Sequence, residues 1–131
     1  MNDTAAQATD RAAVLDVISD VYKAWAGNDA EAMVAGYLPD AVSILPGSLS
    51  DGRDAVRTRM AAGFAGPLKD SSVLDEPLIV RFPHPDTAIV VSRGAILPAG
   101  QTESDRWVVA TWVLTRSADG WAVAAYHNCE A

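Results

Sequence analysis

The chain has 131 residues, of which half are hydrophobic, and a formal net charge of −7 at pH 7. This length fits one domain with a sizeable core, and the acidic balance argues against a nucleic-acid surface. The single cysteine, Cys129, excludes an internal disulfide and fits a reducing cytoplasm. The sequence also carries no Cys/His metal motif, no nucleotide-cofactor fingerprint and no apolar run long enough to span a membrane. We therefore expect a cytoplasmic protein without metal or cofactor.

The first third of the chain predicts a long amphipathic helix. Residues 1–9 are small and polar and are expected to form a flexible arm, so that the folded domain spans residues 10–131. Thr9 or Asp10 can cap the helix, and Gly27 ends it. One apolar stripe repeats along it at helical spacing: Val14, Val17, Ile18, Val21, Tyr22 and Trp25.

Two shorter helices follow. Asn28 and Glu31 form a capping-box pattern, which predicts a second helix over residues 29–37. Asp51 can cap a third helix over residues 53–65. The buried side of this third helix is expected to hold Val56, Met60 and Phe64, which are spaced four residues apart.

The remaining segments are rich in Val, Ile, Thr and Trp, which is typical of β-strands. The predicted strands cover residues 41–45, 49–52, 72–82 and 87–97, and a long hairpin covers residues 102–128. Asp119 and Gly120 supply the positive φ that a tight hairpin turn needs. The expected fold class is α+β: a cone-shaped barrel made of a strongly curved antiparallel sheet wrapped on three N-terminal helices.

Four short sequence segments, by their order and spacing along the chain, resemble those of the nuclear-transport-factor-2-like superfamily, and in particular its SnoaL-like members and the SgcJ/EcaC group. They are Trp25-Ala26-Gly27-Asn28-Asp29-Ala30, Tyr37-Leu38-Pro39-Asp40-Ala41-Val42, Gly52-Arg53-Asp54-Ala55-Val56, and Asp119-Gly120-Trp121-Ala122-Val123-Ala124-Ala125-Tyr126-His127-Asn128. The closing Tyr-His-Asn is most similar to the SgcJ/EcaC group.

The resemblance implies a cone that is usually dimeric through its sheet, with a pocket between sheet and helices. Members of the superfamily include isomerases, dehydratases, epoxide hydrolases and polyketide cyclases, as well as binding domains without catalytic activity. The SgcJ/EcaC group is associated with bacterial natural-product pathways, including enediyne clusters. A shared fold does not by itself establish a shared chemistry.

His127 is the candidate catalytic residue. A three-residue loop at the hairpin turn pairs Ser117 with Trp121 and Thr111 with His127, and it places His127 at the end of an apolar face near the cone mouth. An imidazole there can act as general acid or base near neutral pH. A structural or dimer-interface histidine is the alternative, and a two-residue turn changes the pairing. Asn128 points to the opposite face, where it can bind a ligand or satisfy the strand end.

Aromatic side chains are the candidate ligand contacts. Together with Asn128, the predicted ligand-binding residues are Tyr22, Trp25, Tyr37, Trp107 and Trp112. Aromatic residues at such spacing also occur in ordinary cores, but buried tyrosine hydroxyls need partners, which favours Tyr22 and Tyr37. The hairpin face with Trp112, Leu114 and Tyr126 is too apolar for water and predicts a homodimer.

Two functions are expected from these features. The first is a protein of bacterial natural-product biosynthesis that binds a small apolar, polyketide-like, polyene or polycyclic molecule, and that uses His127 in a cofactor-free cyclisation, isomerisation or dehydration. The second is a ligand-binding or chaperone-like homodimer without catalytic activity, which the absence of an obvious His–Asp pair favours.

Overall fold

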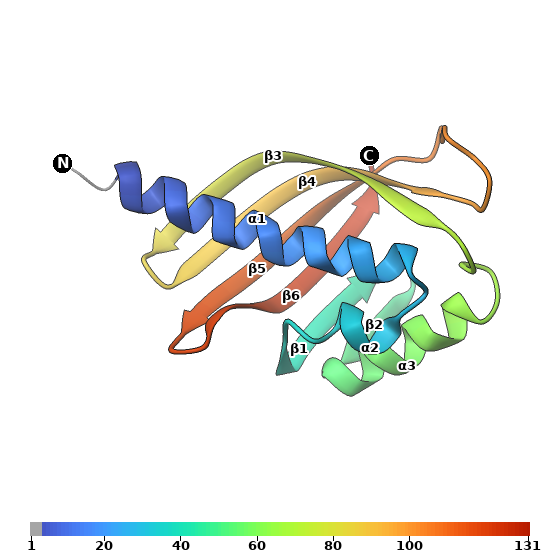
Figure 1. Cartoon of the computed structure of the whole chain (residues 1–131), viewed down its shortest axis with the longest axis horizontal. Coiled ribbons are helices and arrows are strands. Elements are labelled where there is room, and N and C mark those ends of the chain that lie inside the picture. The colour runs from blue at the N-terminus through green and yellow to red at the C-terminus, as the bar shows by residue number, and fades with distance from the viewer. Residues whose placement is uncertain (1–3) are drawn as a thin grey trace.

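The computed structural model describes residues 4–131 and shows helices packed on one face of a single curved sheet (Figure 1). The helices are α1 (Thr4–Ala26), α2 (Ala30–Met33) and α3 (Arg53–Phe64). The strands are β1 (Tyr37–Leu45), β2 (Ser48–Asp51), β3 (Ser72–His84), β4 (Thr87–Leu97), β5 (Val108–Ser117) and β6 (Gly120–Glu130). The predicted α+β class is thereby confirmed.

The long helix starts earlier than the sequence pattern indicated. It was predicted to begin at Thr9 or Asp10, but α1 begins at Thr4, so residues 4–9 of the predicted arm are helical. Residues 1–3 of that arm lie outside the described part of the chain. Within that part, no helix combines the length and the apolarity that crossing a membrane requires.

The second helix begins one residue later than predicted, with Asp29 rather than Asn28 as its N-cap, and it ends earlier, at Met33. The Asp29 side chain accepts a hydrogen bond from the backbone nitrogen of Ala32 at 3.0 Å, and Asn28 instead takes a left-handed φ of 56° in the break after α1. The helix covers only Ala30–Met33, and the chain enters β1 at Tyr37.

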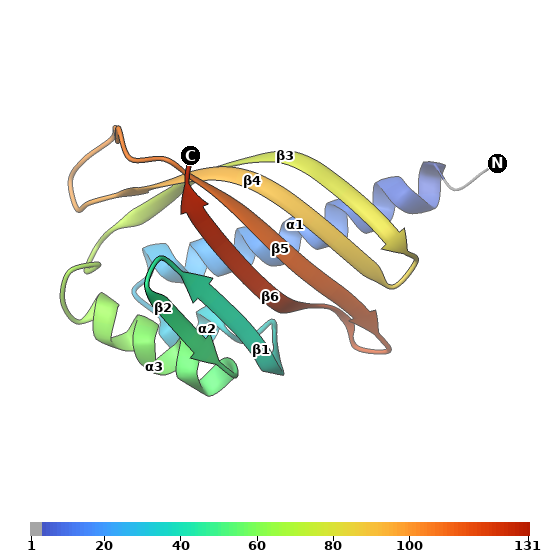
Figure 2. The same cartoon turned by 180° about the vertical axis from the view of Figure 1, so that it is seen from behind.

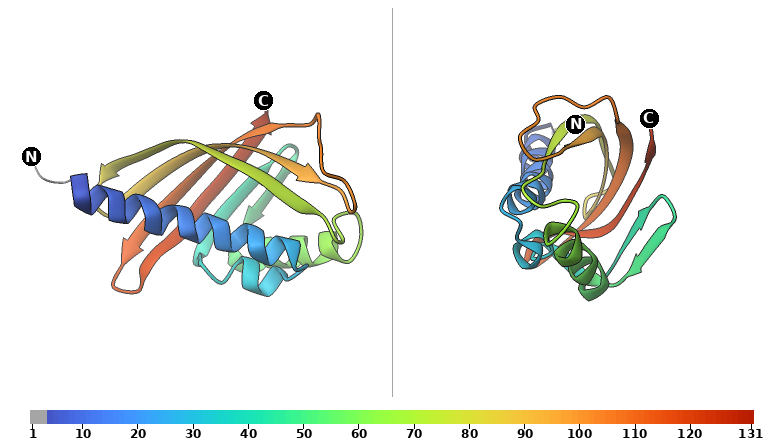
Figure 3. Two further views of the ribbon diagram at one scale, coloured as in Figure 1. Left: turned by 45° about the horizontal axis from the view of Figure 1, so that its top comes forward. Right: turned by 90° about the vertical axis from the view of Figure 1, so that its right-hand side faces the viewer.

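The strands form one six-stranded sheet in the order β2-β1-β6-β5-β4-β3. Neighbouring strands are antiparallel except for β1, which runs parallel to β6. The sheet curves around the helices without closing (Figure 2 and the two views of Figure 3). Its outer edges are therefore the short strand β2 and the long strand β3.

The β5–β6 hairpin differs from the predicted one in its turn and in its faces. Ser117 pairs with Gly120 rather than with Trp121, while Thr111 pairs with His127 as expected. Both are possible because the register shifts between the Val113–Ala125 and Leu114–Val123 pairs, a bulge that leaves one extra residue in β6. As a result, Trp121 and Val123 do not share a face with His127.

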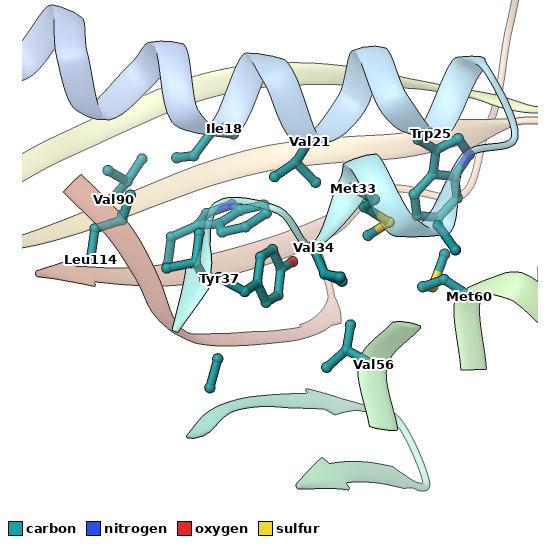
Figure 4. Packing of buried hydrophobic residues seen from close by; sticks show 14 of the residues in the cluster. Ile18, Val21, Trp25, Met33, Val34, Tyr37, Val56, Met60, Val90 and Leu114 are labelled. Carbon is teal, nitrogen blue, oxygen red and sulfur yellow. The ribbon is translucent and has the colours of Figure 1, made fainter. Parts of the chain in front are cut away.

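The core lies between α1 and the concave face of the sheet. Side chains from α1 meet side chains from α2, α3, β1, β4 and β5 in this layer (Figure 4). The face with Trp112 and Leu114 points into it, and these two side chains are 1% and 0% exposed. The prediction that this face is the outer dimer surface was therefore wrong: α1 covers it.

Candidate functional site

The concave face of the sheet carries a row of polar residues near one end of the strands. In β6, Tyr126 and Asn128 point inward while His127, between them, points outward, because side chains alternate along a strand. Tyr126 pairs with Trp112 of β5, and Asn128 pairs with Ala110, which in turn pairs with Ser92 of β4. This register places polar side chains from distant parts of the chain on neighbouring strands.

We call the resulting group the cone cluster. It consists of Tyr22 from α1, Asp75 from β3, Ser92 from β4, Trp112 from β5, and Tyr126 and Asn128 from β6.

Two aromatic contacts hold the cone cluster together. The Trp112 ring packs edge-on against Tyr126, with 4.5 Å between ring centroids, and against Tyr22, at 6.0 Å. Such edge contacts contribute about 0.5–1.5 kcal/mol each beyond area burial. Asn128 Nδ2 donates a hydrogen bond to the Tyr126 hydroxyl at 2.9 Å. The ring contact of Tyr22 with Trp112 thus joins α1 to the sheet, and the hydrogen bond fixes the Tyr126 hydroxyl within β6.

Four buried polar atoms of the cone cluster have no well-formed hydrogen bond. They are Asp75 Oδ1, Ser92 Oγ, Trp112 Nε1 and Asn128 Oδ1. A buried polar atom without a partner costs about 1–3 kcal/mol, so native proteins contain few of them. All four belong to one patch of the concave face, and they include donors as well as acceptors. A polar molecule held at this patch would satisfy them.

Burial sets the protonation of the cone cluster. It raises the pKa of Asp75 above the ordinary 3.8, and the Ser92 hydroxyl opposes part of this rise. Burial also raises the pKa of both Tyr22 and Tyr126, and the charge of Asp75 adds to the rise at each. The two phenols therefore stay protonated near neutral pH and keep hydroxyl protons for donation.

Glycine makes room for the carboxyl. Asp75 pairs with Gly94 across the β3–β4 ladder, and a Cβ at Gly94 would lie 3.2 Å from the carbonyl oxygen of Leu74 and 3.9 Å from Asp75 Oδ1. A larger residue at position 94 would crowd the strand that carries Asp75. Glycine at position 94 therefore avoids a close contact with the backbone of the strand that carries Asp75.

Three of the predicted ligand-binding residues lie in the cone cluster: Tyr22, Trp112 and Asn128. Tyr37 lies beside it, is 4% exposed, and has a pKa that is raised first by burial and then by the nearby Tyr126. These four side chains come from α1, β1, β5 and β6. The structure therefore gathers most of the predicted set in one place.

The remaining two predicted ligand contacts lie apart from the cone cluster. Trp25 packs against Phe64 at 5.5 Å, and its Nε1 donates to Ser71 Oγ at 2.9 Å. Trp107 precedes β5, its Nε1 donates to the carbonyl of Ser104, and the Arg93 guanidinium lies 4.0 Å from its ring. Both indole nitrogens already have partners within the chain.

His127 lies on the opposite side of the sheet from the cone cluster. Its side chain is exposed, and its neighbours on adjacent strands are Thr111 and Ile44. No carboxylate is paired with it in the described residues. The acid/base role predicted for it would have to be carried out on this outer face.

The sequence analysis missed Asp75, Ser92 and Tyr126 as site residues. Ser92 interrupts an otherwise apolar run in β4 and is only 1% exposed, and Asp75 is an acid within a strand of mostly apolar residues. Those interruptions were the available signal. Tyr126 shares a face with Trp112 as predicted, but that face was expected to form the dimer surface, whereas it points into the core.

The fold is that of the nuclear-transport-factor-2-like, or cystatin-like, cone. Similar solved structures include a protein of that class from Novosphingobium aromaticivorans, with a TM-score of 0.83 and 20% identity over 98% of this chain and 88% of that one. A cystatin-like domain of unknown function from Nostoc punctiforme has a TM-score of 0.86 and 22% identity over 94% and 78%. A ketosteroid isomerase-like protein from Erwinia carotovora atroseptica has a TM-score of 0.73 and 21% identity over 91% and 94%.

The family is narrower than the fold. Residues 14–129 match the model of the SnoaL-like domain, and the chain belongs to that family. No curated protein matches the sequence. The solved structures are too distant in sequence to show more than the shared fold.

Proposed function

We propose that the cone cluster binds an uncharged small molecule that carries both a carbonyl and a hydroxyl group on an apolar frame. The observation that supports this is the set of four unpartnered buried atoms. Trp112 Nε1 can only donate a hydrogen bond, so it needs a carbonyl-like acceptor, and Asn128 Oδ1 can only accept one, so it needs a hydroxyl-like donor. The aromatic rings around them suit a flat apolar body.

The same arrangement suits proton transfer beside a carbonyl. The Asp75 carboxylate would take a proton from the carbon next to the carbonyl, and the electron pair would move onto the carbonyl oxygen. The Tyr126 hydroxyl and Trp112 Nε1 would donate hydrogen bonds to that oxygen. Asp75 would then return the proton to a different carbon, which completes an isomerisation without a cofactor. Its raised pKa makes Asp75 a stronger base than an exposed aspartate.

Hydrogen–deuterium exchange at carbon tests this chemistry directly. A panel of cyclic hydroxy-ketones and enones is incubated in deuterated water with the protein, and exchange is followed by NMR. We expect Asp75→Asn to lose the catalysed exchange while binding, measured by tryptophan fluorescence, persists. Glu76→Gln is the matched control, because Glu76 is the next residue but pairs with Arg93 at 3.7 Å on the other face. Equal exchange by both variants would refute the role of Asp75.

His127 remains the alternative acid/base residue predicted by the sequence. The geometry favours Asp75 because Asp75 faces the unpartnered atoms of the cone cluster and His127 does not. The variant His127→Ala distinguishes the two in the same exchange assay. Loss of exchange in this variant alone would assign the chemistry to the outer face.

A binding role without catalysis is the second candidate. Among the described residues, no cationic group and no imidazole belongs to the cone cluster, so Asp75 has no second acid/base group beside it apart from phenols. A protein that holds a reactive intermediate needs only the hydrogen bonds and the apolar walls. Ligand binding with no exchange by the unaltered protein would support this candidate.

The pathway is proposed on the resemblance of Tyr126-His127-Asn128 to the SgcJ/EcaC group. On that basis the ligand would be a polyketide-like, polyene or polycyclic intermediate of bacterial natural-product biosynthesis, including the enediyne type. A cytoplasmic location is proposed because the lone cysteine, Cys129, is free and exposed. Binding of hydroxylated polycyclic ketones, but not of short aliphatic ketones, by the purified protein would support the ligand class.

We also propose a homodimer through the outer face of the sheet. One row crosses this face from edge to edge: Ile79, Val91, Thr111, His127, Ile44 and Leu49. A two-fold axis parallel to the strands, between β5 and β6, would place Ile79 against Leu49 and Val91 against Ile44 of the second copy. The same axis would place the polar Thr111 against the polar His127. Ile79, Ile44 and Leu49 are 39%, 41% and 68% exposed in the single chain. Sedimentation of Ile44→Lys as a monomer and of the unaltered chain as a dimer would support this interface.

A further inference from the structure

A groove separate from the cone cluster runs between the start of α1 and the end of β3. It has a volume of about 410 Å³ and is lined by Gln7, Ala8 and Arg11 from the helix and by Val80, Arg81 and Phe82 from the strand. Because β3 is an edge strand, no other strand covers this side of it. Val80 and Phe82 are half-buried and pack against the core, so the floor of the groove is apolar.

Two exposed arginines flank this floor, and neither has a carboxylate partner in the described part of the chain. Among residues 4–131, neither Arg11 nor Arg81 takes part in an ion pair. Within residues 4–131, Arg81 Nη1 donates to the carbonyl oxygen of Val80, at 3.3 Å, which is a neutral acceptor. This is unexpected in a chain with 17 acidic and 10 basic residues, where acids are plentiful.

Two acids near these arginines in the sequence, Asp10 and Asp86, already form ion pairs with another residue. Asp10 accepts from Arg116 Nη1 at 2.7 Å, and Asp86, in the turn after β3, accepts from Arg116 Nε at 3.1 Å. Arg116 therefore pairs with both of these carboxylates. The groove is left with two guanidinium groups of like charge and the amide of Gln7 as hydrogen-bond donors.

We propose that this groove binds a small organic anion, with a carboxylate or phosphate group held by Arg11 and Arg81 and an apolar body resting on Val80 and Phe82. A guanidinium offers paired N–H donors that match two oxygens of such a group. The anion would relieve the repulsion between the two arginines. The net charge of −7 makes the rest of the chain repel anions, which confines binding to this local site.

NMR titration of the 15N-labelled protein tests the proposal with three probes of similar body: benzoate, phenyl phosphate and the neutral benzamide. We expect the two anions, and not benzamide, to shift the backbone amides of Ala8, Arg11, Arg81 and Phe82. The anion that binds more tightly identifies whether the natural group is a carboxylate or a phosphate. Added salt should weaken both, since screening reduces the attraction of exposed charges.

A matched charge control separates a built site from a general charge effect. The double variant Arg11→Gln/Arg81→Gln should raise the dissociation constant of the better anion about tenfold, as expected when charge-assisted hydrogen bonds are lost. The control Arg59→Gln/Arg106→Gln removes the same number of charges from two residues that are also exposed and in no ion pair among residues 4–131, and should leave the constant unchanged. Equal weakening by both variants, or unshifted groove amides, would overturn the proposal.

Discussion

Two buried serines offer a matched test of whether the fold leaves polar groups of the cone unpaired. Ser71 is 2% exposed and Ser92 is 1% exposed. Ser71 Oγ accepts a hydrogen bond from Trp25 Nε1 at 2.9 Å and donates one to the carbonyl oxygen of Leu68 at 2.6 Å. Ser92 Oγ has no well-formed hydrogen bond. Substitution by alanine removes the same hydroxyl oxygen at nearly equal burial, but this oxygen is hydrogen-bonded in Ser71 and not in Ser92.

The two substitutions should therefore change stability in different directions. Ser71→Ala leaves the indole N–H of Trp25 unpaired in the core, which costs about 1–3 kcal/mol. Ser92→Ala removes a buried hydroxyl that the fold does not satisfy, and should be neutral or stabilise by about 1 kcal/mol. The gain in stability is limited because the substitution also removes the interaction by which the Ser92 hydroxyl stabilises the charged Asp75 carboxylate. In a domain of this size, 1 kcal/mol moves the Tm by about 4 °C.

Urea denaturation at neutral pH, with thermal melts as a second measure, gives the two free energies of unfolding. A clear loss of stability in Ser71→Ala together with none in Ser92→Ala would support the view that the cone holds unpaired polar atoms. If Ser92→Ala destabilises the fold as much as Ser71→Ala does, the Ser92 hydroxyl is satisfied within the protein. Ser92 would then offer no free hydroxyl to a ligand, and the cone cluster would lose its support as a binding site.

Three further predictions concern charged groups. Because burial raises the pKa of Asp75, the folded protein holds this proton more tightly than the unfolded chain does. The stability that comes from the protonated carboxyl is therefore lost as the pH rises through the raised pKa. Asp75→Asn should be more stable than the unaltered chain at pH 7 but not at pH 3, as measured by urea denaturation. His127→Ala should leave the free energy of unfolding of the monomer within about 0.5 kcal/mol, because the side chain is exposed; a larger loss would show that it is packed. Arg116→Lys should destabilise by about 1 kcal/mol in a thermal melt, since lysine cannot bridge Asp10 and Asp86 with one fork, and an unchanged Tm would contradict this.

Much of the fold could be predicted because the pattern of apolar residues matches the elements. The strand over residues 87–97 has the predicted bounds, and the helix over 53–64 ends one residue before its prediction. Val56, Met60 and Phe64 are buried as their spacing indicated. These elements depend on local periodicity, which the sequence displays directly.

The sequence could not show that Trp121 and Val123 lie on the opposite face from His127, because this depends on one extra residue in β6. The two-residue turn shifts the pairing by one, and the bulge near Ala124 shifts it back, so Thr111 still meets His127. Between the turn and the bulge the inward set is Trp121 and Val123, and beyond the bulge it is Tyr126 and Asn128. Periodicity of two cannot reveal where such a shift occurs.

The candidate site was predicted in part because aromatic and amide side chains are conspicuous, whereas Asp75 is not. A single carboxylate in a strand is usually a solvated charge. Asp75 differs because it pairs with Gly94 and lies on the same face of the sheet as Ser92 and Asn128. That information is long-range. It becomes available only when the sheet order is known.

The cost of the cone cluster argues for a role beyond folding. Apolar residues at these positions would pack between α1 and the sheet without leaving polar atoms unpaired, and cores tolerate such exchanges when volume is kept. The chain instead places a carboxyl oxygen, a hydroxyl, an indole N–H and an amide oxygen side by side, and none of these four atoms makes a well-formed hydrogen bond within residues 4–131. Proteins accept lower stability where a site must stay ready for a ligand. The surrounding apolar layer, which is almost fully buried, is what allows the fold to carry this cost.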